Sequence, residues 1–383
     1  MQIRLITLIF LLITGNAFSQ QTDTLTFFSK AFGQECSVVI HLPEFYEYKA
    51  DTVQLPVVYV LDGQHEWFVD PLLTTLHYLQ YTHQIPSVLT VVIPHNNRNQ
   101  ECAVPSLEES LPLDRFITED LEGQLAAYRP NPYRILIGHS LSALFALYSA
   151  QRNPDFYTAV LSCTPPGEFE DLIPRFTTAE RYNLDRIYLA IGGLGKEKDY
   201  YHRRVYDELK QRYPSFFSAI HTFEADFAAH NAVPIVAIPA FLTELFSDFS
   251  SRYIKIAEVD MEYKLVQMPT SIEAELASIR QASRLGDYYY APQLSDINGL
   301  ASRYYASGLM DYSAAIYELG IKYFPKYFEF YLSLYDSYLD TDIDRAKFCL
   351  LKAEELLRLL EMGHTDTQEI LDAVLEERAA QGW

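Results

Sequence analysis

The 383-residue sequence predicts an α/β protein, in which helices flank a mostly parallel sheet, followed by a small all-α region. Short apolar runs alternate with helical stretches up to about residue 249, and the strand signal disappears after about residue 250. Within the first of these regions, near residue 140, one apolar run leads through a tight turn straight into a helix. Because this length exceeds what one hydrophobic core usually holds, we expect two folded units.

Eight runs are expected to form strands. Several of them, such as VVYVL, LTVVI and ILIG, are continuously apolar, which suits central strands buried on both faces. The first two runs have no helix between them and therefore predict an antiparallel hairpin at the sheet edge. The predicted strands are Leu25–Ala31, Cys36–Leu42, Pro56–Leu61, Val88–Ile93, Arg134–Gly138, Ala159–Cys163, Arg186–Ile191 and Ala219–Phe223. The predicted helices include Leu113–Tyr128, Leu141–Gln151, Tyr200–Arg212 and Val233–Phe249.

The region from about Ser295 predicts two helical hairpins at a spacing of about 34 residues, the period of a tetratricopeptide repeat. Large, small and aromatic residues recur where that repeat needs them. They are Leu300, Ala301, Tyr304, Gly308, Gly320 and Pro325, and then Leu334, Tyr338, Ala346 and Ala353. An ordinary amphipathic helical tail is the alternative. Two repeats alone bury little surface, so we expect this region to pack on the rest of the chain or on a protein partner.

The first 19 residues have the features of a secretory signal peptide. Arg4 is an early positive charge, Leu5–Ile13 is an apolar run, and small residues precede an expected cleavage after Ser19. An N-terminal membrane anchor is the alternative, but the apolar run is short for a membrane span. We therefore expect an exported protein, periplasmic or secreted, whose mature chain does not insert into a membrane.

The composition excludes several classes of partner. A net charge of −21 argues against nucleic acid or an anionic membrane surface, because both need a basic face. The four cysteines are scattered without a CxxC pair, so a structural zinc site is not expected. We expect no metal and no cofactor, and cysteines that are free or form at most one disulfide.

The clearest chemical motif is RILIGHSLSALFALYSA, residues 134–150. A β-rich run leads to Gly138-His139-Ser140-Leu141-Ser142 and then into an Ala/Leu-rich helix, the context of a nucleophile elbow in an α/β-hydrolase fold. The Ser140 hydroxyl would project at the amino end of the helix, where the N–H of Leu141 could bind a developing oxyanion. Ser142 replaces the final glycine of the usual G-x-S-x-G pattern. A capping serine in an ordinary strand-to-helix turn is the alternative.

A nucleophilic serine needs a general base, and in this fold the chain order is serine, acid, histidine. Three histidines follow Ser140. His230 is the expected base because it comes just after the last predicted strand, in the loop from which a base can reach the serine. His202 lies in a charged helical stretch and His221 lies within a strand run, so both are less suited to that role.

The remaining site residues are predicted from loops that follow other strands. The acid should follow the strand that ends at Ile191, where Glu197 is preferred and Asp199 is the alternative, unless both are solvated and no acid is used. A second oxyanion N–H is expected from Gly63 or Gln64, although an ordinary strand-end turn is equally compatible. Arg98 follows the next strand and is a candidate for binding a substrate carboxylate or carbonyl, or else an ordinary surface arginine.

These motifs resemble those of the esterases related to esterase D and the ferric-enterobactin esterases. The resemblance rests on PVVYVLDG, NNRNQECAVPS, GHSLSALFAL and HNAVPIVAIPAFLTELF, and it covers about 60% of the chain. It implies hydrolysis of carboxylic esters through an acyl-serine without a cofactor, with Ser140 as nucleophile, His230 as base and Glu197 as acid. The family's N-T-D-R-T-R-D-L-T-P stretch is altered here at Asn97, Asn99 and Gln100, so no substrate preference is carried over.

The sequence thus predicts a serine esterase acting on a small-molecule ester such as a siderophore, feruloyl or acetyl ester. The alternatives are a non-catalytic hydrolase-fold scaffold whose helical tail binds a partner, and an acyltransferase. The expected organisation is a signal peptide (1–19), a catalytic domain (24–250), a helical linker (251–294), repeat-like helices (295–362) and a C-terminal helix or tail (363–383).

Overall fold

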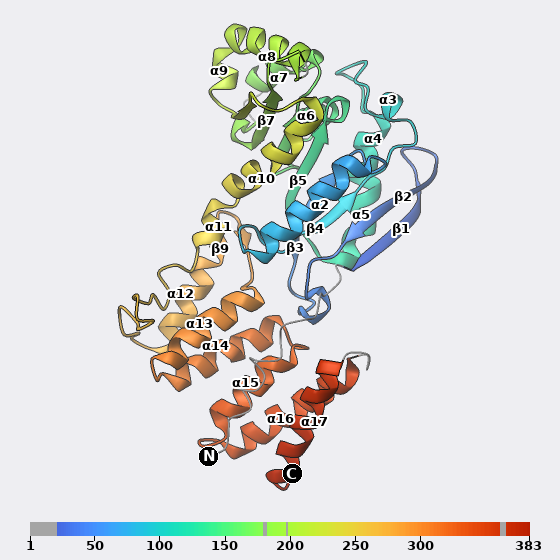
Figure 1. Ribbon diagram of the computed structural model, residues 1–383. Coiled ribbons are helices and arrows are strands. Elements are labelled where there is room, and N and C mark those ends of the chain that lie inside the picture. The colour runs from blue at the N-terminus through green and yellow to red at the C-terminus, as the bar shows by residue number, and fades with distance from the viewer. Residues whose placement is uncertain (1–20, 179–181, 197, 361–364) are drawn as a thin grey trace. The chain divides into compact units, whose positions relative to one another are not determined.

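The computed structural model describes residues 21–178, 182–196, 198–360 and 365–383, and the predicted signal peptide lies outside them. The chain divides into two compact units (Figure 1). The first, the catalytic unit, comprises the described residues within 21–44 and 54–250, and the second, the helical unit, comprises the described residues within 45–53 and 251–383.

An eight-stranded sheet forms the centre of the catalytic unit, with strand order β1-β2-β4-β3-β5-β6-β7-β8. β1 pairs antiparallel with β2 and β2 antiparallel with β4, whereas every pair from β4 to β8 is parallel. The predicted α/β class and its edge hairpin are therefore confirmed. The strands are β1 Thr22–Ser29, β2 Gln34–His41, β3 Leu55–Val60, β4 Leu89–Val92, β5 Pro130–His139, β6 Ala159–Cys163, β7 Ile187–Gly192 and β8 His221–Ala225.

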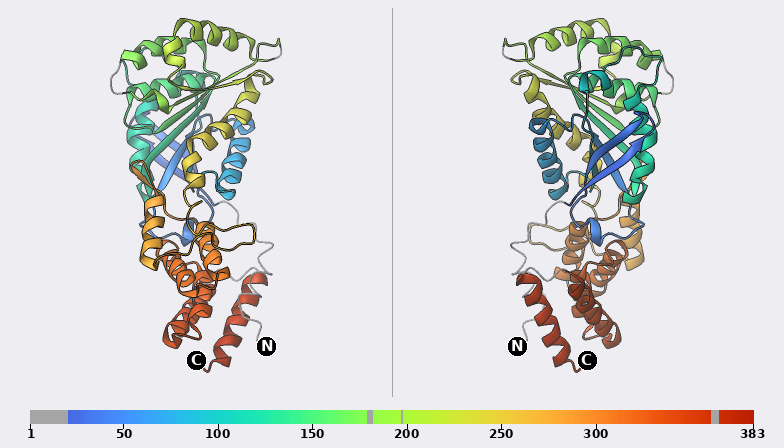
Figure 2. Two further views of the ribbon diagram at one scale, coloured as in Figure 1. Left: turned by 90° about the vertical axis from the view of Figure 1, so that its left-hand side faces the viewer. Right: turned by 90° about the vertical axis from the view of Figure 1, so that its right-hand side faces the viewer.

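The continuously apolar runs become central strands because helices cover both faces of the sheet. Every residue of β3, β4, β6 and β7 is buried. α2 (Glu66–Tyr81) and α10 (Val233–Leu245) pack together on one face, as the blue and yellow helices of Figure 2 show. α4 (Pro112–Arg115), α5 (Glu122–Leu125) and α6 (Leu141–Arg152) lie on the other.

The other helices differ in detail from the prediction. The single predicted helix Leu113–Tyr128 is α4, the π-helical η2 (Phe116–Leu121), α5 and the 3-10 turn η3 (Ala126–Tyr128), while Val233–Phe249 is split into α10 and α11 (Ser247–Ser251). The sequence pattern did not reveal α2. The remaining elements of this unit are α3 Arg98–Glu101, η4 Gly167–Leu172, α7 Ile173–Thr178, η5 Leu184–Arg186, α8 Tyr200–Arg212, α9 Pro214–Phe217 and η6 His230–Ala232.

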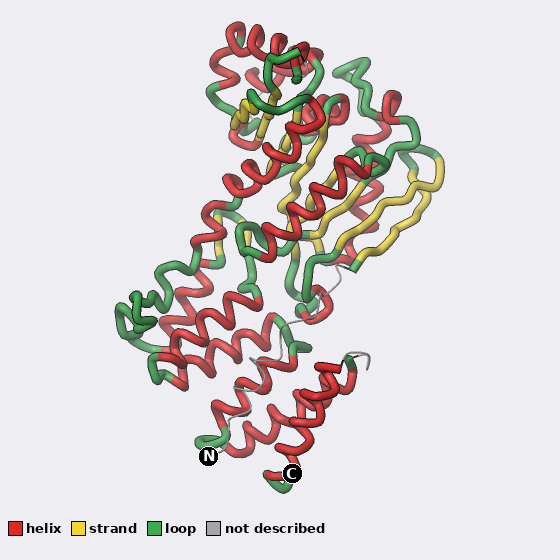
Figure 3. Tube along the Cα trace, viewed as in Figure 1, coloured by secondary structure: helices red, strands yellow, loops and turns green. Residues whose placement is uncertain are grey.

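The helical unit contains the two helical pairs that the sequence spacing predicts (Figure 3). α13 packs on α14, and α15 packs on α16. Gly320 of α14 is needed for close packing, because a Cβ there would lie 2.7 Å from the ring of Phe330 and 2.8 Å from Ile297. The assignment to the tetratricopeptide class stays a prediction. The elements are α12 Ile272–Ala282, β9 Arg284–Leu285, β10 Tyr288–Tyr289, α13 Leu294–Ala306, α14 Met310–Tyr323, α15 Phe328–Tyr338, α16 Ile343–Leu359 and α17 Thr365–Ala380.

Residues 45–53, which include η1 (Tyr46–Tyr48), leave the catalytic unit and pack in the helical unit. The rings of Phe45 and Tyr48 contact Tyr327, and the backbone N–H of Ala50 donates to the carbonyl of Tyr323 at 2.8 Å. The sequence pattern had placed this segment within the catalytic region.

Two further expectations concern the membrane and the cysteines. No helix among the described residues is both long and apolar enough to cross a membrane. The four cysteines, all within the described part of the chain, are free.

Candidate active site

Ser140 lies at the junction of β5 and α6 in a strained backbone conformation, with φ 58° and ψ −121°. A residue other than glycine in such a region costs about 1–3 kcal/mol, and such strain concentrates at functional sites. Its N–H donates to the carbonyl of Cys163 at 2.9 Å. The turn is tight enough that a Cβ on Gly138 would lie 2.4 Å from the carbonyl oxygen of Ser142. The motif thus forms a sharp elbow at the carboxyl end of a central strand.

His230 is hydrogen-bonded to Asp199, which follows the neighbouring strand β7. The distance from His230 Nδ1 to Asp199 Oδ1 is 2.9 Å, and the Asp199 side chain is 1% exposed. Because an ionised carboxylate only accepts, the imidazole Nδ1–H is the donor. Asp199 was the alternative acid in the sequence. The preferred residue, Glu197, lies outside the described residues.

The loops that carry this pair are held in close contact by glycine. A Cβ on Gly193 would lie 1.9 Å from the carbonyl oxygen of Asp226, so only glycine fits between the loop after β7 and the loop after β8. The carbonyl of Gly193 also accepts a hydrogen bond from the N–H of Asp199 at 2.9 Å. The backbone therefore holds the Asp199 carboxylate within hydrogen-bonding distance of the His230 imidazole.

A second histidine shares the Asp199 carboxylate. His202 Nδ1 lies 2.8 Å from the same Oδ1, and its ring stacks on His230 with centroids 4.5 Å apart. Burial opposes ionisation of Asp199, but hydrogen bonds from His202 and His230 outweigh it and hold the pKa of this carboxyl well below its usual value. The sequence analysis considered His202 only as a base and did not predict its contact with Asp199, although a position three residues later, at the start of α8, is the spacing at which helical side chains meet.

Asp199, His202 and His230 are also the described residues that could hold a metal ion, since one ligand atom of each lies within 4.8 Å of the others. Both imidazoles already direct Nδ1 at the carboxylate within hydrogen-bonding distance. Hydrogen bonding alone accounts for the arrangement.

His139 connects the base to the elbow. Its Nε2–H donates to the carbonyl of His230 at 3.1 Å, and the two rings lie 4.6 Å apart. Burial, followed by the charge of His230, lowers the pKa of His139 to about 4, so this imidazole is neutral near pH 7. His139 directly precedes Ser140, and the base is therefore docked beside the nucleophile. Among the described residues no hydrogen bond joins Ser140 Oγ to His230, and such bonds often tighten only when substrate binds.

The two predicted oxyanion donors follow the neighbouring strands β3 and β5. Within the described chain, neither the N–H of Gln64 nor that of Leu141 donates a hydrogen bond to the protein. The Gln64 side chain is fixed, because its Oε1 accepts from the N–H of His95 at 2.9 Å. Two backbone donors at one edge of the sheet are thus available to a ligand oxygen.

Arg98, for which the sequence predicts a role in binding substrate, makes hydrogen bonds inside the protein. Its Nε donates to Asp62 Oδ1 at 2.5 Å, and its Nη2 donates to Asp62 Oδ2 at 3.1 Å and to the carbonyl of His139 at 2.9 Å. The Asp62 side chain is 1% exposed, and a buried carboxylate needs such a partner.

Asp62 is the centre of a polar cluster beneath the elbow, which we call the elbow network: Asp62, His95, Arg98, Glu101 and Ser142. Ser142 Oγ donates to Asp62 at 2.6 Å and accepts from the N–H of His139 at 2.9 Å. The serine that replaces the usual glycine therefore links the Asp62 carboxylate to the backbone of the elbow. Burial opposes ionisation of Asp62, but hydrogen bonds from Arg98 and Ser142 hold its pKa below the usual value. His95, in turn, is hydrogen-bonded to Glu101 at 2.9 Å. Sequence reasoning missed this network, whose signal is polar residues directly after two adjacent strands.

The fold and this site define the class of protein: an α/β-hydrolase, with a strained serine at the carboxyl edge of a parallel sheet and a histidine–aspartate pair on nearby loops. Residues 29–199 match the family model described as "Putative esterase", and the resemblance seen in the sequence is thereby confirmed. The chain is a carboxylic ester hydrolase.

Solved structures agree in fold. An IroE-like serine hydrolase from Shewanella oneidensis superposes with a TM-score of 0.57 at 18% identity, over 78% of this chain and 98% of its own. An uncharacterised protein from Capnocytophaga ochracea superposes with a TM-score of 0.53 at 14% identity, over 94% of this chain and 100% of its own. Siderophore hydrolase EstA from Aspergillus nidulans superposes with a TM-score of 0.50 at 15% identity, over 61% of this chain and 96% of its own. At such identities the similarity extends to the fold alone. No curated protein matches the sequence.

Proposed function

We propose that the chain is a serine esterase that works through an acyl-enzyme on Ser140, with His230 as general base and Asp199 as the acid that orients it. The observation that carries this proposal is the 2.9 Å hydrogen bond from His230 to the buried Asp199, at the edge of the sheet where Ser140 is held in strain. Asp199 takes the role that the sequence had assigned first to Glu197.

In the first half of the reaction, His230 removes the hydroxyl proton of Ser140 as its oxygen attacks the ester carbonyl carbon. The carbonyl oxygen becomes an oxyanion that accepts hydrogen bonds from the N–H groups of Leu141 and Gln64. Asp199 holds the imidazole with Nδ1 protonated and stabilises the imidazolium, and it stays ionised throughout.

Collapse of the tetrahedral intermediate breaks the ester C–O bond, and the imidazolium gives its proton to the departing alcohol. Water then repeats the sequence on the acyl-serine and releases the carboxylic acid. The elbow network acts through the backbone, because Arg98 and Ser142 bond to the backbone of His139, the residue before the nucleophile.

The direct test is hydrolysis of a p-nitrophenyl ester by the parent and by Ser140→Ala. We expect Ser140→Ala to reduce kcat by at least about 10³-fold, because members of such a unit act together. Ser218→Ala, at an exposed serine of the same unit, is the matched control and should retain the parent rate. Equal hydrolysis by parent and Ser140→Ala would favour the scaffold alternative, in which the hydrolase fold has no catalytic role.

The cellular setting is a second part of the proposal. The apolar segment after Arg4 supports export to the periplasm or beyond, with the signal removed after Ser19. Cell fractionation and N-terminal sequencing of the mature chain test this. The helical pairs α13–α14 and α15–α16 support a role in holding a protein partner, which cross-linking in the native host would test.

A further inference from the structure

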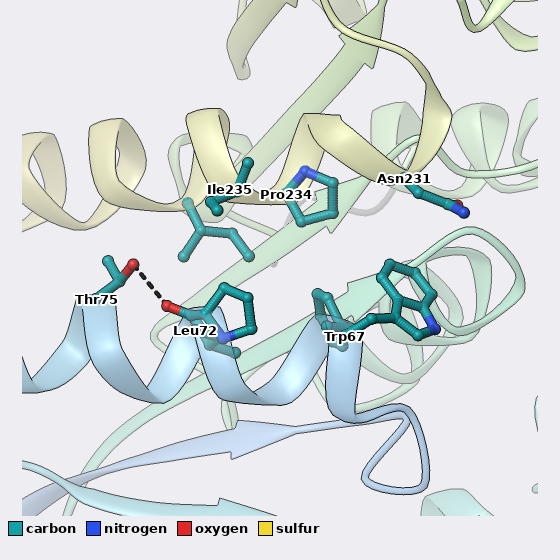
Figure 4. Close-up of a pocket in the computed structure, with 9 residues that line it drawn as sticks. Trp67, Leu72, Thr75, Asn231, Pro234 and Ile235 are labelled. Carbon is teal, nitrogen blue, oxygen red and sulfur yellow. Dashed lines mark hydrogen bonds between the residues drawn. The ribbon is translucent and has the colours of Figure 1, made fainter.

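A groove with a cavity volume of about 80 Å³, partly open to solvent, lies between α2 and α10 (Figure 4). Side chains of the two helices face one another across it. Its floor is apolar and buried: Phe68, Leu72 and Ile238 are at most 4% exposed. Trp67 and Ile235 flank the groove and are 47% and 54% exposed. A half-exposed tryptophan and isoleucine beside a buried apolar floor leave a surface that a ligand can cover.

The groove adjoins the proposed site at one end, where Trp67 and Asn231 lie on opposite sides of it (Figure 4). On α2, the ring of Trp67 lies 5.6 Å from that of His139 and Phe68 lies 5.9 Å from it, and His139 directly precedes Ser140. On the α10 side, the lining begins at Asn231, the residue after the base His230. A group bound in the groove is therefore next to the atoms that react.

The chemistry of the lining selects against charge. None of the nine residues that line the groove carries a charge. The hydroxyl of Thr75 is already used, because it donates to the carbonyl of Pro71 at 2.8 Å. The nearby guanidinium of Arg98 is bound to Asp62, and the chain carries a net charge of −21. An anionic substrate, such as a ferric catecholate, finds no free cation here and meets an unfavourable overall field.

We propose that this groove binds an uncharged apolar group of the ester substrate, about the size of one aromatic ring or a short alkyl chain. The inference rests on the proposed esterase function and adds its substrate class. Trp67 and Ile235 cover the two sides of the bound group, while Phe68, Leu72 and Ile238 form its floor. The group is either the acyl or the alcohol part of the ester, and both have the same chemistry.

The test compares kcat/KM across two sets of esters with the full-length mature protein. In the acyl set, p-nitrophenol is constant and the acid is acetic, butyric, hexanoic, benzoic or succinic. In the alcohol set, acetate is constant and the alcohol is methyl, butyl or benzyl. We expect kcat/KM to rise roughly fourfold for each methylene group buried, in one set or the other. The succinyl ester, which carries a charge, should be the poorest of its set.

Ile235→Asp places a charge at the edge of the groove on a half-exposed side chain, where folding should be unaffected. We expect it to lower kcat/KM for the preferred apolar ester about tenfold, and to lower the ratio of that kcat/KM to the value for methyl acetate. Ile343→Asp, at a 50% exposed isoleucine of the helical unit, is the matched control and should change neither. A folding check by thermal unfolding accompanies both variants.

The outcomes separate the inference from the function on which it rests. Turnover of p-nitrophenyl acetate with no apolar preference in either set, or an unchanged preference in Ile235→Asp, overturns the groove assignment alone. Better turnover of the succinyl ester than of the butyryl ester overturns it as well. If no ester is hydrolysed and a fluorophosphonate fails to label Ser140, the esterase mechanism fails and the groove assignment fails with it.

Discussion

Ser140 is held in its strained conformation by contacts on both sides of the turn. Its N–H bonds to Cys163 on the neighbouring strand, and its carbonyl accepts from the N–H of Ala143 at 3.0 Å in the first turn of α6. The strand and the helix thus over-determine the angle between them, and their packing offsets the local cost of about 1–3 kcal/mol. Because the backbone of Ser140 is held in this way, the direction in which its side chain leaves the turn is fixed.

The choice of acid gives the first prediction. Asp199→Asn should lower kcat about 10³-fold, because an amide no longer holds the imidazole in the required tautomer or stabilises its cation. Glu197→Gln, two positions away in the sequence, is the matched control and should stay within about twofold of the parent. Steady-state kinetics on one p-nitrophenyl ester decides between them. The reverse pattern would return the role to Glu197.

Arg98 gives a second prediction at the residue scale. Arg98→Gln should lower the free energy of unfolding by about 3 kcal/mol, because it removes the main partner of the buried Asp62 carboxylate. Arg204→Gln removes an exposed arginine from a weak surface pair with Glu208 and should change it by less than about 0.5 kcal/mol. Chemical denaturation measures both. A stable Arg98→Gln protein with only a raised KM would instead support the substrate-binding role expected from the sequence.

His139 makes the stability depend on pH. Its pKa falls from 6.5 to about 4 on folding, so between these values the unfolded chain binds a proton that the folded chain does not. Stability therefore rises with pH through this window, and at pH 5 this group costs about 2 kcal/mol relative to pH 7. His139→Gln should show a correspondingly shallower loss of stability between pH 7 and pH 5. Parallel pH profiles for parent and variant would contradict the assignment of a buried, neutral His139.

At the scale of elements, periodicity and apolar runs were enough to locate the sheet. β3, β4 and β7 are buried throughout, and their sequences LPVVYV, LTVV and IYLAIG show it directly. The pattern failed for α2, whose helix contains Pro71 and whose apolar residues do not stand out from the strands around it. It also gave no sign of the ion pair between Arg98 and Asp62, because a side chain's partner 36 residues away leaves no mark in a local pattern.

Two glycines of the helical unit give a prediction about helix packing. Gly320→Ala should lower the free energy of unfolding by about 1–3 kcal/mol, because the added methyl group meets Phe330 and Ile297. Gly299→Ala, in α13, adds a methyl group with no atom within 4 Å and should raise it by about 0.5–1 kcal/mol. Urea unfolding followed by circular dichroism distinguishes the two. Equal effects would mean that Gly320 is not a packing position.

At the scale of the whole molecule, chain order predicted which histidine is the base but left two candidate residues for the acid. In a parallel sheet the loops after β5, β7 and β8 share one edge, so a serine and a histidine 90 residues apart could be expected together. Glu197 and Asp199 are two residues apart in the sequence, which offers no means of choosing between them. The packing of residues 45–53 in the helical unit was equally hidden, because Tyr323 and Tyr327, which they contact, come more than 270 positions later.

The most direct measurement of the central claim is the rate at which a fluorophosphonate labels the folded protein, with the modified peptide identified by mass spectrometry. We predict a label on Ser140 alone and a labelling rate at least about 10²-fold lower in His230→Ala. A label on another serine, or the same labelling rate with and without the imidazole of His230, would contradict it.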